Sequence, residues 1–365
     1  MDISISAKKR SIWSRFANWT LRHKKIAIGI AASFTLVAVS GVTAAFLYPM
    51  PASPKPQVAA AITSPAPEPQ KWYSPLTGVE VPDEATTKRQ VTAIMIENSV
   101  FARPQSSLKA AGVVFEAIAE GGITRFLTLH QEDRPQMIGP VRSLRPYYID
   151  WVASFDAAVA HVGGSYNALK TIRNGQFKDI DQFFNGSYYW RATDRDAPHN
   201  VYTNFDKLDA LNKSKGFVSS AFTPWARKLN SPSATPTASK IDITISSGDF
   251  NVHYDYDAPS NTYIRSEGGK GHKDREAGQL APNVVIALKI PTQLGFEDGY
   301  REQMSTIGIG TAYIFQDGIV TEAIWRKPSQ KAQIQFYDKL GRIVALNPGQ
   351  TWISVTAPEK KVTWQ

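Results

Sequence analysis

The chain has 365 residues, of which 42% are apolar and 11% aromatic. This composition supports a large buried core and excludes a wholly disordered protein, and the length fits two domains of ordinary size. Cysteine is absent, which excludes disulfide bonds, cysteine-ligated zinc, a thiol nucleophile and a lipid anchor on cysteine.

The net charge of +9 is concentrated at the N-terminus. Residues 1–25 contain seven basic residues and one acidic residue, whereas the rest of the chain has 34 basic and 31 acidic residues. The remainder is therefore only weakly basic, and we expect no nucleic-acid partner.

An uncharged and mostly apolar segment, residues 26–48, follows this basic tail. As a helix, its 23 residues would extend about 34 Å, enough for the roughly 30 Å of a bilayer's hydrocarbon core. The positive-inside rule then predicts a single-pass plasma-membrane protein with residues 1–25 in the cytoplasm and its bulk extracytoplasmic. The alternative is a signal peptide that is cleaved.

Two low-complexity segments divide the rest of the chain. Residues 49–71 are rich in proline and predict an extended stalk, because proline fixes φ and lacks a backbone donor. Residues 231–239 (SPSATPTAS) predict a linker between a first domain, residues 72–230, and a second domain, residues 240–365.

The first domain alternates between strand and helix patterns, which predicts an α/β arrangement. The Gly121-Gly122 pair separates two strand patterns and predicts a hairpin. Ser165 is a typical N-cap residue for a helix that ends at Ile172. The predicted strands are residues 91–96, 112–119, 125–130 and 157–162, and the other predicted helix is 147–155.

The second domain has dense strand signals separated by turn residues, which predicts a mostly antiparallel β domain. The fold class is therefore α+β. The predicted strands are residues 241–245, 250–256, 262–265, 283–290, 310–315, 319–325, 334–337 and 352–355.

Several arginines of the first domain predict an anion-binding cleft, because a guanidinium forms paired hydrogen bonds with a phosphate or carboxylate. Gly163-Gly164-Ser165 adds the backbone amides of a helix start. The candidate anion-binding residues are Arg103, Arg125, Arg142, Ser143, Arg145, Gly163, Gly164, Ser165, Arg191, Arg195 and Asn200. The candidate catalytic residues are Glu116, Glu120 and His199, and the two glutamates are also candidate metal ligands.

Structural roles are an open alternative for each of these residues. Arginines beside prolines often bind loop carbonyl groups, and Glu116 with Arg125 could form an ion pair across the hairpin. The glycine-rich segment 268–272 predicts a loop between strands, in which Lys270 and His272 are further candidates for ligand contact. No P-loop, HExxH, GxSxG or EF-hand motif occurs in the chain.

In sequence order, the motifs GVVFEAIAEGGITRFLTL, IGPVRSLRPYYIDWV, FDAAVAHVGGS and YWRATDRDAPHN resemble the first domain of the YerB-like lipoprotein family of bacteria. APNVVIALKI, GTAYIFQDGIVTEAIWRK and LNPGQTWISV are similar to its second domain, so that the resemblance covers residues 72–357. The family has no established activity, and the resemblance implies an extracytoplasmic protein tethered to the plasma membrane. A lipoprotein requires a cysteine, which this chain lacks, so we expect residues 26–48 to replace the lipid anchor.

The layout is also similar to that of the LytR-CpsA-Psr phosphotransferases, which have a cytoplasmic tail, one transmembrane helix and an external α/β domain. Glu116, then Ser143 between Arg142 and Arg145, then Gly163-Gly164 follow an order found in that family.

Three functions are consistent with the sequence. The first, which we adopt, is a cell-envelope module whose arginine-lined cleft binds an anionic glycan, peptide carboxylate or lipid phosphate. The second is a phosphotransferase or hydrolase acting on a polyprenyl-phosphate-linked wall polymer, for which Mg²⁺ would be the cofactor. The third is an architectural envelope component without a ligand.

Overall fold

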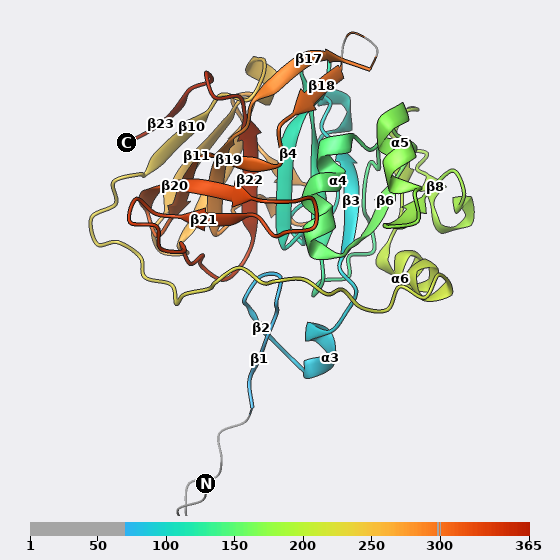
Figure 1. Cartoon of the computed structure of the whole chain (residues 1–365), viewed down its shortest axis with the longest axis horizontal. Coiled ribbons are helices and arrows are strands. Elements are labelled where there is room, and N and C mark those ends of the chain that lie inside the picture. The colour runs from blue at the N-terminus through green and yellow to red at the C-terminus, as the bar shows by residue number, and fades with distance from the viewer. Residues whose placement is uncertain (1–69, 298, 300) are drawn as a thin grey trace, which may run out of the picture. The chain divides into compact units, whose positions relative to one another are not determined.

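The computed structural model describes residues 70–365, except 298 and 300. The described residues form one compact unit (Figure 1). The predicted cytoplasmic tail, membrane helix and nearly all of the stalk lie outside the described residues. Within the described part, no helix is long and apolar enough to cross a membrane.

The first half of the described chain contains short helices and both parallel and antiparallel strands. Its strands are β1 (Trp72–Tyr73), β2 (Glu80–Val81), β3 (Thr92–Glu97), β4 (Val113–Glu120), β5 (Ile123–His130), β6 (Ala158–His161), β7 (Lys178–Asp181), β8 (Trp190–Arg191) and β9 (Val201–Tyr202). Its α-helices are α3 (Glu84–Thr87), α4 (Pro146–Val152), α5 (Tyr166–Ile172) and α6 (Phe205–Ser214). Its 3-10 helices are η1 (Val100–Ala102), η2 (Ala153–Phe155) and η3 (Gly186–Tyr188).

The second half is built from strands and one described 3-10 helix, η4 (Gly248–Phe250). The strands are β10 (Lys240–Ile243), β11 (Val252–Asp257), β12 (Thr262–Glu267), β13 (Lys270–Gly271), β14 (Lys273–Asp274), β15 (Gly278–Gln279), β16 (Val284–Lys289), β17 (Thr292–Phe296), β18 (Arg301–Met304), β19 (Gly308–Gln316), β20 (Ile319–Lys327), β21 (Gln335–Tyr337), β22 (Thr351–Thr356) and β23 (Val362–Trp364).

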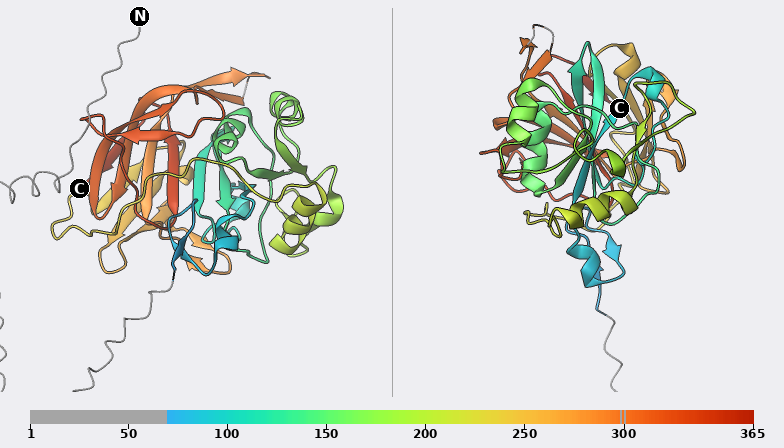
Figure 2. Two further views of the ribbon diagram at one scale, coloured as in Figure 1. Left: turned by 60° about the horizontal axis from the view of Figure 1, so that its bottom comes forward. Right: turned by 90° about the vertical axis from the view of Figure 1, so that its right-hand side faces the viewer.

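One mixed sheet runs through both halves, in the order β21-β20-β19-β16-β22-β4-β5-β3-β6-β7 (Figures 1 and 2). The predicted hairpin is confirmed, because β4 and β5 pair antiparallel. β22 inserts between β16 and β4 and is parallel to both. The predicted second domain therefore contributes strands to the same sheet as the predicted first domain, across the predicted linker.

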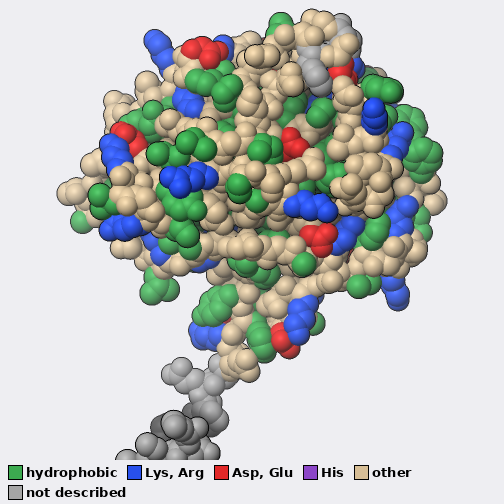
Figure 3. Space-filling model, viewed as in Figure 1, with side chains coloured by type: hydrophobic (Ala, Val, Ile, Leu, Met, Phe, Trp, Pro, Cys, Tyr) green, Lys and Arg blue, Asp and Glu red, His purple; other side chains and the backbone are tan. Residues whose placement is uncertain are grey.

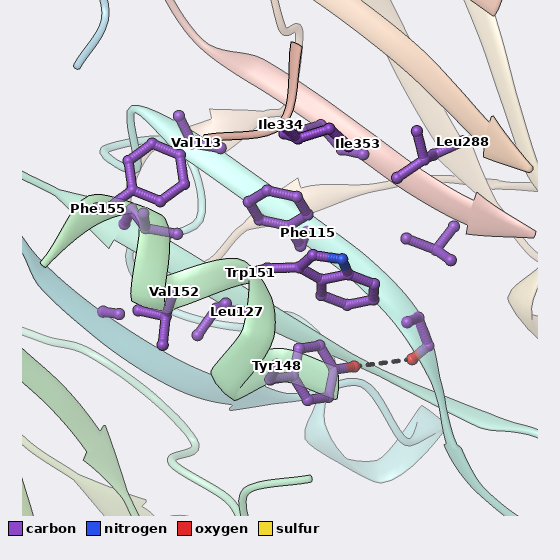
Figure 4. Close-up of a cluster of buried hydrophobic side chains, with 14 of the residues drawn as sticks. Val113, Phe115, Leu127, Tyr148, Trp151, Val152, Phe155, Leu288, Ile334 and Ile353 are labelled. Atoms are coloured by element: carbon purple, nitrogen blue, oxygen red, sulfur yellow. Dashed lines mark hydrogen bonds between the residues drawn. The ribbon is translucent and has the colours of Figure 1, made fainter. Parts of the chain in front are cut away.

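β4 is buried on both faces, and alternate residues enter different cores. Val113, Phe115 and Ala117 belong to one hydrophobic cluster, whereas Val114 belongs to another. In the first cluster the rings of Phe115 and Trp151 of α4 stack with centroids 5.2 Å apart (Figure 4). The Tyr148 hydroxyl donates to the carbonyl oxygen of Ala117 (3.0 Å), which ties α4 to this strand (Figure 4).

The opposite face of the sheet is covered by α6, which the sequence analysis did not predict. Phe205, Leu208 and Leu211 of this helix pack into the second cluster. Asn204 caps the helix by accepting a hydrogen bond from the backbone amide of Lys207 (2.9 Å). Helices therefore cover both faces of the mixed sheet, as the predicted α/β layering requires.

The predicted mostly antiparallel second part is confirmed by a second sheet, in the order β13-β12-β11-β10-β23. Apolar side chains of β10 and β11 pack against those of β16 and β19 in a third cluster. This packing forms a sandwich at one end of the mixed sheet.

The predicted linker, residues 231–239, contains no helix or strand and follows the surface of the second half. Its backbone is nevertheless held, since the amides of Thr237 and Ala238 both donate to the carbonyl oxygen of Gly318 (3.0 Å each). On the face shown in Figure 3, basic and acidic side chains are interspersed and form no single basic patch.

Candidate functional site

Charged side chains gather where β3 and β4 end and β5 begins. Glu97 ends β3 and Glu120 ends β4, while Arg125 pairs with Glu97 in the antiparallel register of β3 and β5. β6 runs parallel to β3, so the loop after β6 reaches the same edge of the sheet. Ligands of α/β proteins commonly bind at such an edge, beyond the carboxyl ends of parallel strands.

Glu120 is held between two guanidinium groups. Arg125 and Arg145 both donate to its carboxylate, and the Nε of Arg145 is 2.8 Å from Oε2. Burial acts to raise the pKa of Glu120, but the charges of the two arginines outweigh it and lower the pKa. Arg125 also donates to the carbonyl oxygen of Ser143 (2.9 Å), which fixes the neighbouring loop.

Arg142 lies beside this group and is less completely paired. The Nε atom of Arg142 lies 3.2 Å from Oε2 of Glu97. This nitrogen is buried and has no hydrogen-bond partner among the described residues. Burial lowers the pKa of Arg142, and the positive charge of Arg125 contributes to the same shift. The backbone of Arg142 is fixed on both sides, because its amide donates to the carbonyl oxygen of Met95 and its carbonyl oxygen accepts from the amide of Val162.

The carboxylate of Glu97 also binds His199. Nδ1 of the imidazole is 2.8 Å from Oε1 of Glu97, and the Ser99 hydroxyl is 3.4 Å from the same nitrogen. An ionised carboxylate can only accept a hydrogen bond, so Nδ1 of His199 is the donor in this contact. Because serine and glutamate share one ring nitrogen, the three residues do not form a nucleophilic triad, in which each would bind a different nitrogen.

Glu116 belongs to a separate, fully buried network. Nη2 of Arg265 lies 3.1 and 3.0 Å from its two oxygens, and the Trp352 indole donates to Oε2 (3.0 Å). The guanidinium of Arg265 also lies over the ring of Trp352, 4.3 Å from its centroid. Both carboxylate oxygens are therefore occupied by the protein itself.

Asn98 connects this network to Arg103. The Asn98 amide donates to Oε1 of Glu267 (2.6 Å), while its oxygen accepts from Nε of Arg103 (3.1 Å). Arg103 also donates to the backbone of Asp249 in the second half (3.0 Å) and lies 3.4 Å from Glu267. Arg103 thus joins the two halves of the described chain.

The helix start after Gly163 is occupied by another part of the chain. Oε1 of Glu297 accepts from the Ser165 hydroxyl (3.0 Å) and from the Asn167 amide (2.9 Å). Gly163 has φ +59, and an added Cβ would lie 2.7 Å from the ring of Phe183. The Gly163 amide donates to Asp181 (3.0 Å), and Gly164 packs against the Leu144 carbonyl.

The remaining candidates brace loops. Nη1 of Arg191 donates to the Asn200 side chain (2.7 Å), and the Asn200 amide donates to the carbonyl oxygens of Ala192 and Arg195. Arg195 donates to the carbonyl oxygens of Ala102 and Pro104. These contacts hold the segment that carries His199 against the segment that carries Arg103.

The geometry divides the predicted residues into groups. Arg125, Arg142, Arg145 and Glu120 lie together, with Glu97 and His199 at one side. Arg103 reaches the second half through Asn98, whereas Glu116 lies in the core and Arg191, Arg195 and Asn200 bind loop atoms.

Two family models match the chain, over residues 76–218 and 241–353. They are described as the N-terminal and C-terminal domains of a protein of unknown function, DUF3048. This chain belongs to the DUF3048 family. The two matches lie on either side of residues 231–239.

One relative shares 32% identity with this chain over 292 residues, which are 78% of this chain and 86% of the relative's own length. It is the protein of Bacillus subtilis (strain 168) named "Putative lipoprotein YerB". The crystal structure of YerB from Bacillus subtilis superposes with a TM-score of 0.72 at 30% identity, covering 80% of this chain and all of that structure. The resemblance to YerB-like proteins is thereby confirmed.

Among the residues described for this DUF3048 protein, no three or more His, Asp or Glu side chains are grouped so that they could hold a metal ion. The carboxylate of Glu116 accepts hydrogen bonds from Arg265 and Trp352, and the carboxylate of Glu120 accepts hydrogen bonds from Arg125 and Arg145. The two candidate metal ligands thus each have cationic partners.

Sequence reasoning missed Glu97, Asn98, Arg265 and Glu267. Glu97 and Asn98 directly follow a predicted strand, and polar residues at the end of a strand were the available signal of a site there. Arg265 ends a predicted strand of the other half and Glu267 lies two residues beyond it. No local pattern places either residue beside Glu116 or Asn98.

Proposed function

We propose that this protein is a membrane-anchored, extracytoplasmic component of the cell envelope that binds an anionic group of an envelope ligand at Arg142. The location is supported by the lipoprotein name of its relative and by the basic tail and apolar segment of residues 1–48. A carboxylate or a phosphate is the group that a guanidinium recognises best.

The observation that carries this proposal is the charge balance around Arg142. Three guanidinium groups, those of Arg125, Arg142 and Arg145, face two carboxylates, those of Glu97 and Glu120. Arg125 and Arg145 donate hydrogen bonds to Glu120. Within the described part of the chain, Arg142 makes a single ion pair, between its Nε and Glu97 at 3.2 Å. An anion would balance the third guanidinium and could also accept a hydrogen bond from it.

Two exposed aromatic rings lie near residues that adjoin this group. Phe101 is 76% exposed, and its ring centroid is 5.7 Å from that of His199. Phe183 is 69% exposed and lies over Gly163, next to Val162, whose amide binds the Arg142 carbonyl oxygen. Exposed rings beside a partly paired charge favour a ligand that has apolar faces as well as an acid group.

Calorimetric titration of the full chain in detergent tests the proposal. The ligands are soluble peptidoglycan fragments, a glycerol-phosphate oligomer and anionic lipid in mixed micelles, which represent the three classes of anion. Arg142→Ala should weaken binding of the recognised ligand about tenfold or more, the effect of one lost charge-assisted hydrogen bond. Arg342→Ala, an exposed ion-paired arginine after β21, is the control. Unchanged affinity of the Arg142 variant for every bound ligand contradicts the proposal.

A further inference from the structure

A second site is formed where the segment after η1 meets the β12–β13 hairpin. The two segments enclose a pocket of about 350 Å³, a volume in the range of pockets that hold small ligands. Val100 and Arg103 line it from the first half, and Lys270, His272 and Lys273 line it from the second. Arg142 is not among the described residues that line this pocket, so the pocket is separate from the proposed site at Arg142.

The lining of the pocket carries an excess of positive charge. Among the described residues that line the pocket, Arg103, Lys270 and Lys273 are basic, and Asp249 and Glu267 are acidic. The guanidinium of Arg103 is held in place by Asn98, by the Asp249 carbonyl oxygen and by the ring of Phe250, whose centroid is 5.1 Å away. A fixed guanidinium binds an anion without first losing conformational freedom.

Glu267 lies in the wall of the pocket and is almost completely buried. Its Oε1 is 3.4 Å from Arg103 and 3.5 Å from Arg265. Its Oε2 accepts no hydrogen bond and lies 3.4 Å from Nδ1 of His272. That nitrogen already accepts from Nε of Arg265 (2.9 Å), so the imidazole is neutral and offers no proton to the carboxylate.

The charged groups around Glu267 shift its pKa in opposite directions. Burial is the largest effect and, together with the charge of Glu116, raises the pKa of Glu267 to about 7, although Arg265 and Arg103 act to lower it. His272 does not contribute a charge, because burial and the same two arginines hold its pKa well below the usual value. Near neutral pH, protonation of Glu267 therefore decides whether the charge of Arg103 is compensated.

We infer that this pocket binds a small organic oxyanion between Arg103, Lys270 and Lys273, and that Glu267 couples this binding to the uptake of a proton. Ionised Glu267 offsets the charge of Arg103 and repels an incoming anion, whereas neutral Glu267 leaves the positive field of the pocket intact. By reciprocity, an anion in the pocket favours the protonated form of Glu267 by the same factor. Glu267 acts through the field at Arg103 and needs no contact with the ligand.

Ligand-observed NMR titrations with the full chain in detergent test both the binding of an anion and its coupling to the protonation of Glu267. Two matched pairs of probes separate the sources of the oxyanion: N-acetylmuramic acid with N-acetylglucosamine for a carboxylate, and glycerol 3-phosphate with glycerol for a phosphate ester. We expect at least one of the two anions to bind, and its neutral counterpart to bind at least tenfold more weakly. Lys270→Ala and Lys273→Ala should each lower the affinity for that anion several-fold. Lys361→Ala is the control, because this exposed lysine precedes β23. That strand lies at the opposite edge of the five-stranded sheet from β13, which contains Lys270.

The proton link is measured by comparing pH 6 with pH 8. For N-acetylmuramic acid, whose carboxylate is ionised at both pH values, affinity should fall roughly three- to tenfold at pH 8 in the wild type. The Glu267→Gln variant should retain the pH 6 affinity at both values. For glycerol 3-phosphate, which itself titrates near pH 6, the ratio of variant to wild-type affinity should rise between the two pH values.

The pocket assignment is overturned if neither anion binds at ~10 mM, which corresponds to negligible affinity. It is also overturned if a neutral probe binds as well as its anion, or if both lysine variants bind the anion as tightly as the wild type does. Equal pH dependence in the wild type and the Glu267→Gln variant overturns the proton link. Arg142→Ala should leave binding in this pocket unchanged, so failure here and failure of the proposed site at Arg142 give different results.

Discussion

Arg265 and Glu116 are 149 positions apart in the chain and form a completely buried ion pair. Arg265 comes from β12 of the five-stranded sheet, and Glu116 comes from β4 in the middle of the mixed sheet. Tyr254 accepts a further hydrogen bond from the same guanidinium (2.7 Å). The two halves of the described chain are thus connected by a charge pair that water does not reach.

Loss of either member of this pair should destabilise the whole compact unit. Arg265→Met leaves a buried carboxylate without its cation and should lower the free energy of unfolding by about 3 to 5 kcal/mol. Chemical denaturation followed by tryptophan fluorescence measures this change. Arg342→Ala, at an exposed pair, should cost less than about 1 kcal/mol. Equal stability of the Arg265→Met variant and the wild type would show that the pair contributes nothing.

Arg142 and Arg145 are only three positions apart, and their substitutions should have different effects. Arg145 is buried and binds both Glu120 and the Leu144 carbonyl oxygen, so Arg145→Ala should cost about 2 to 3 kcal/mol. Arg142 makes a single ion pair and is partly exposed, so Arg142→Ala should cost about 1 kcal/mol or less. Thermal unfolding of both variants, run beside the binding titrations, distinguishes a ligand-binding arginine from a structural one. The reverse order of stability loss would contradict this division.

The raised pKa of Glu267 predicts a pH-dependent contribution to stability. In the folded state the group takes up its proton near pH 7 instead of at the usual value for glutamate, so folding is favoured at low pH and this contribution is lost as pH rises through about 7. Glu267→Gln removes the dependence. The stability of the variant relative to the wild type should therefore increase between pH 5 and pH 8, by up to about 3 kcal/mol.

Denaturation midpoints at several pH values measure this difference. Glu322→Gln is a matched control, because that side chain on β20 is half exposed and pairs with the exposed Lys339. A Glu267→Gln profile that runs parallel to the wild-type profile would rule out a shifted titration at this position.

Gly163 should tolerate a side chain less well than Gly175. Both have positive φ, +59 and +85, which costs an alanine roughly 1 kcal/mol. Nothing lies within 4 Å of an added Cβ at Gly175, whereas at Gly163 the ring of Phe183 lies at 2.7 Å. The backbone of Gly163 is also held by Asp181 and Leu144. We expect Gly163→Ala to cost about 2 kcal/mol and Gly175→Ala about 1 kcal/mol in thermal unfolding. Equal costs would show that the contact with Phe183 is unimportant.

Local sequence patterns were sufficient for most strands and for the hairpin of β4 and β5. The apolar run of residues 91–96 and the Gly121-Gly122 turn depend on side-chain periodicity and backbone conformation, which are properties of neighbouring residues. The helix α6 was missed, although Asn204 is a typical cap, because its apolar residues are spaced among charged ones. The central position of β22 could not be found either, since a parallel pairing between distant segments has no local signature.

By itself the sequence determined the α+β class, the strand-rich second half, and the family through its ordered motifs, because these depend on short-range patterns. It also identified Arg142 and His199 as residues of interest. Only the tertiary structure decided which charges are compensated: Arg125 and Arg145 enclose Glu120, Glu297 occupies the start of α5, and Arg265 neutralises Glu116. Charge compensation depends on distances between segments that the fold alone brings together, and the free positive charge of a site is what remains after that compensation.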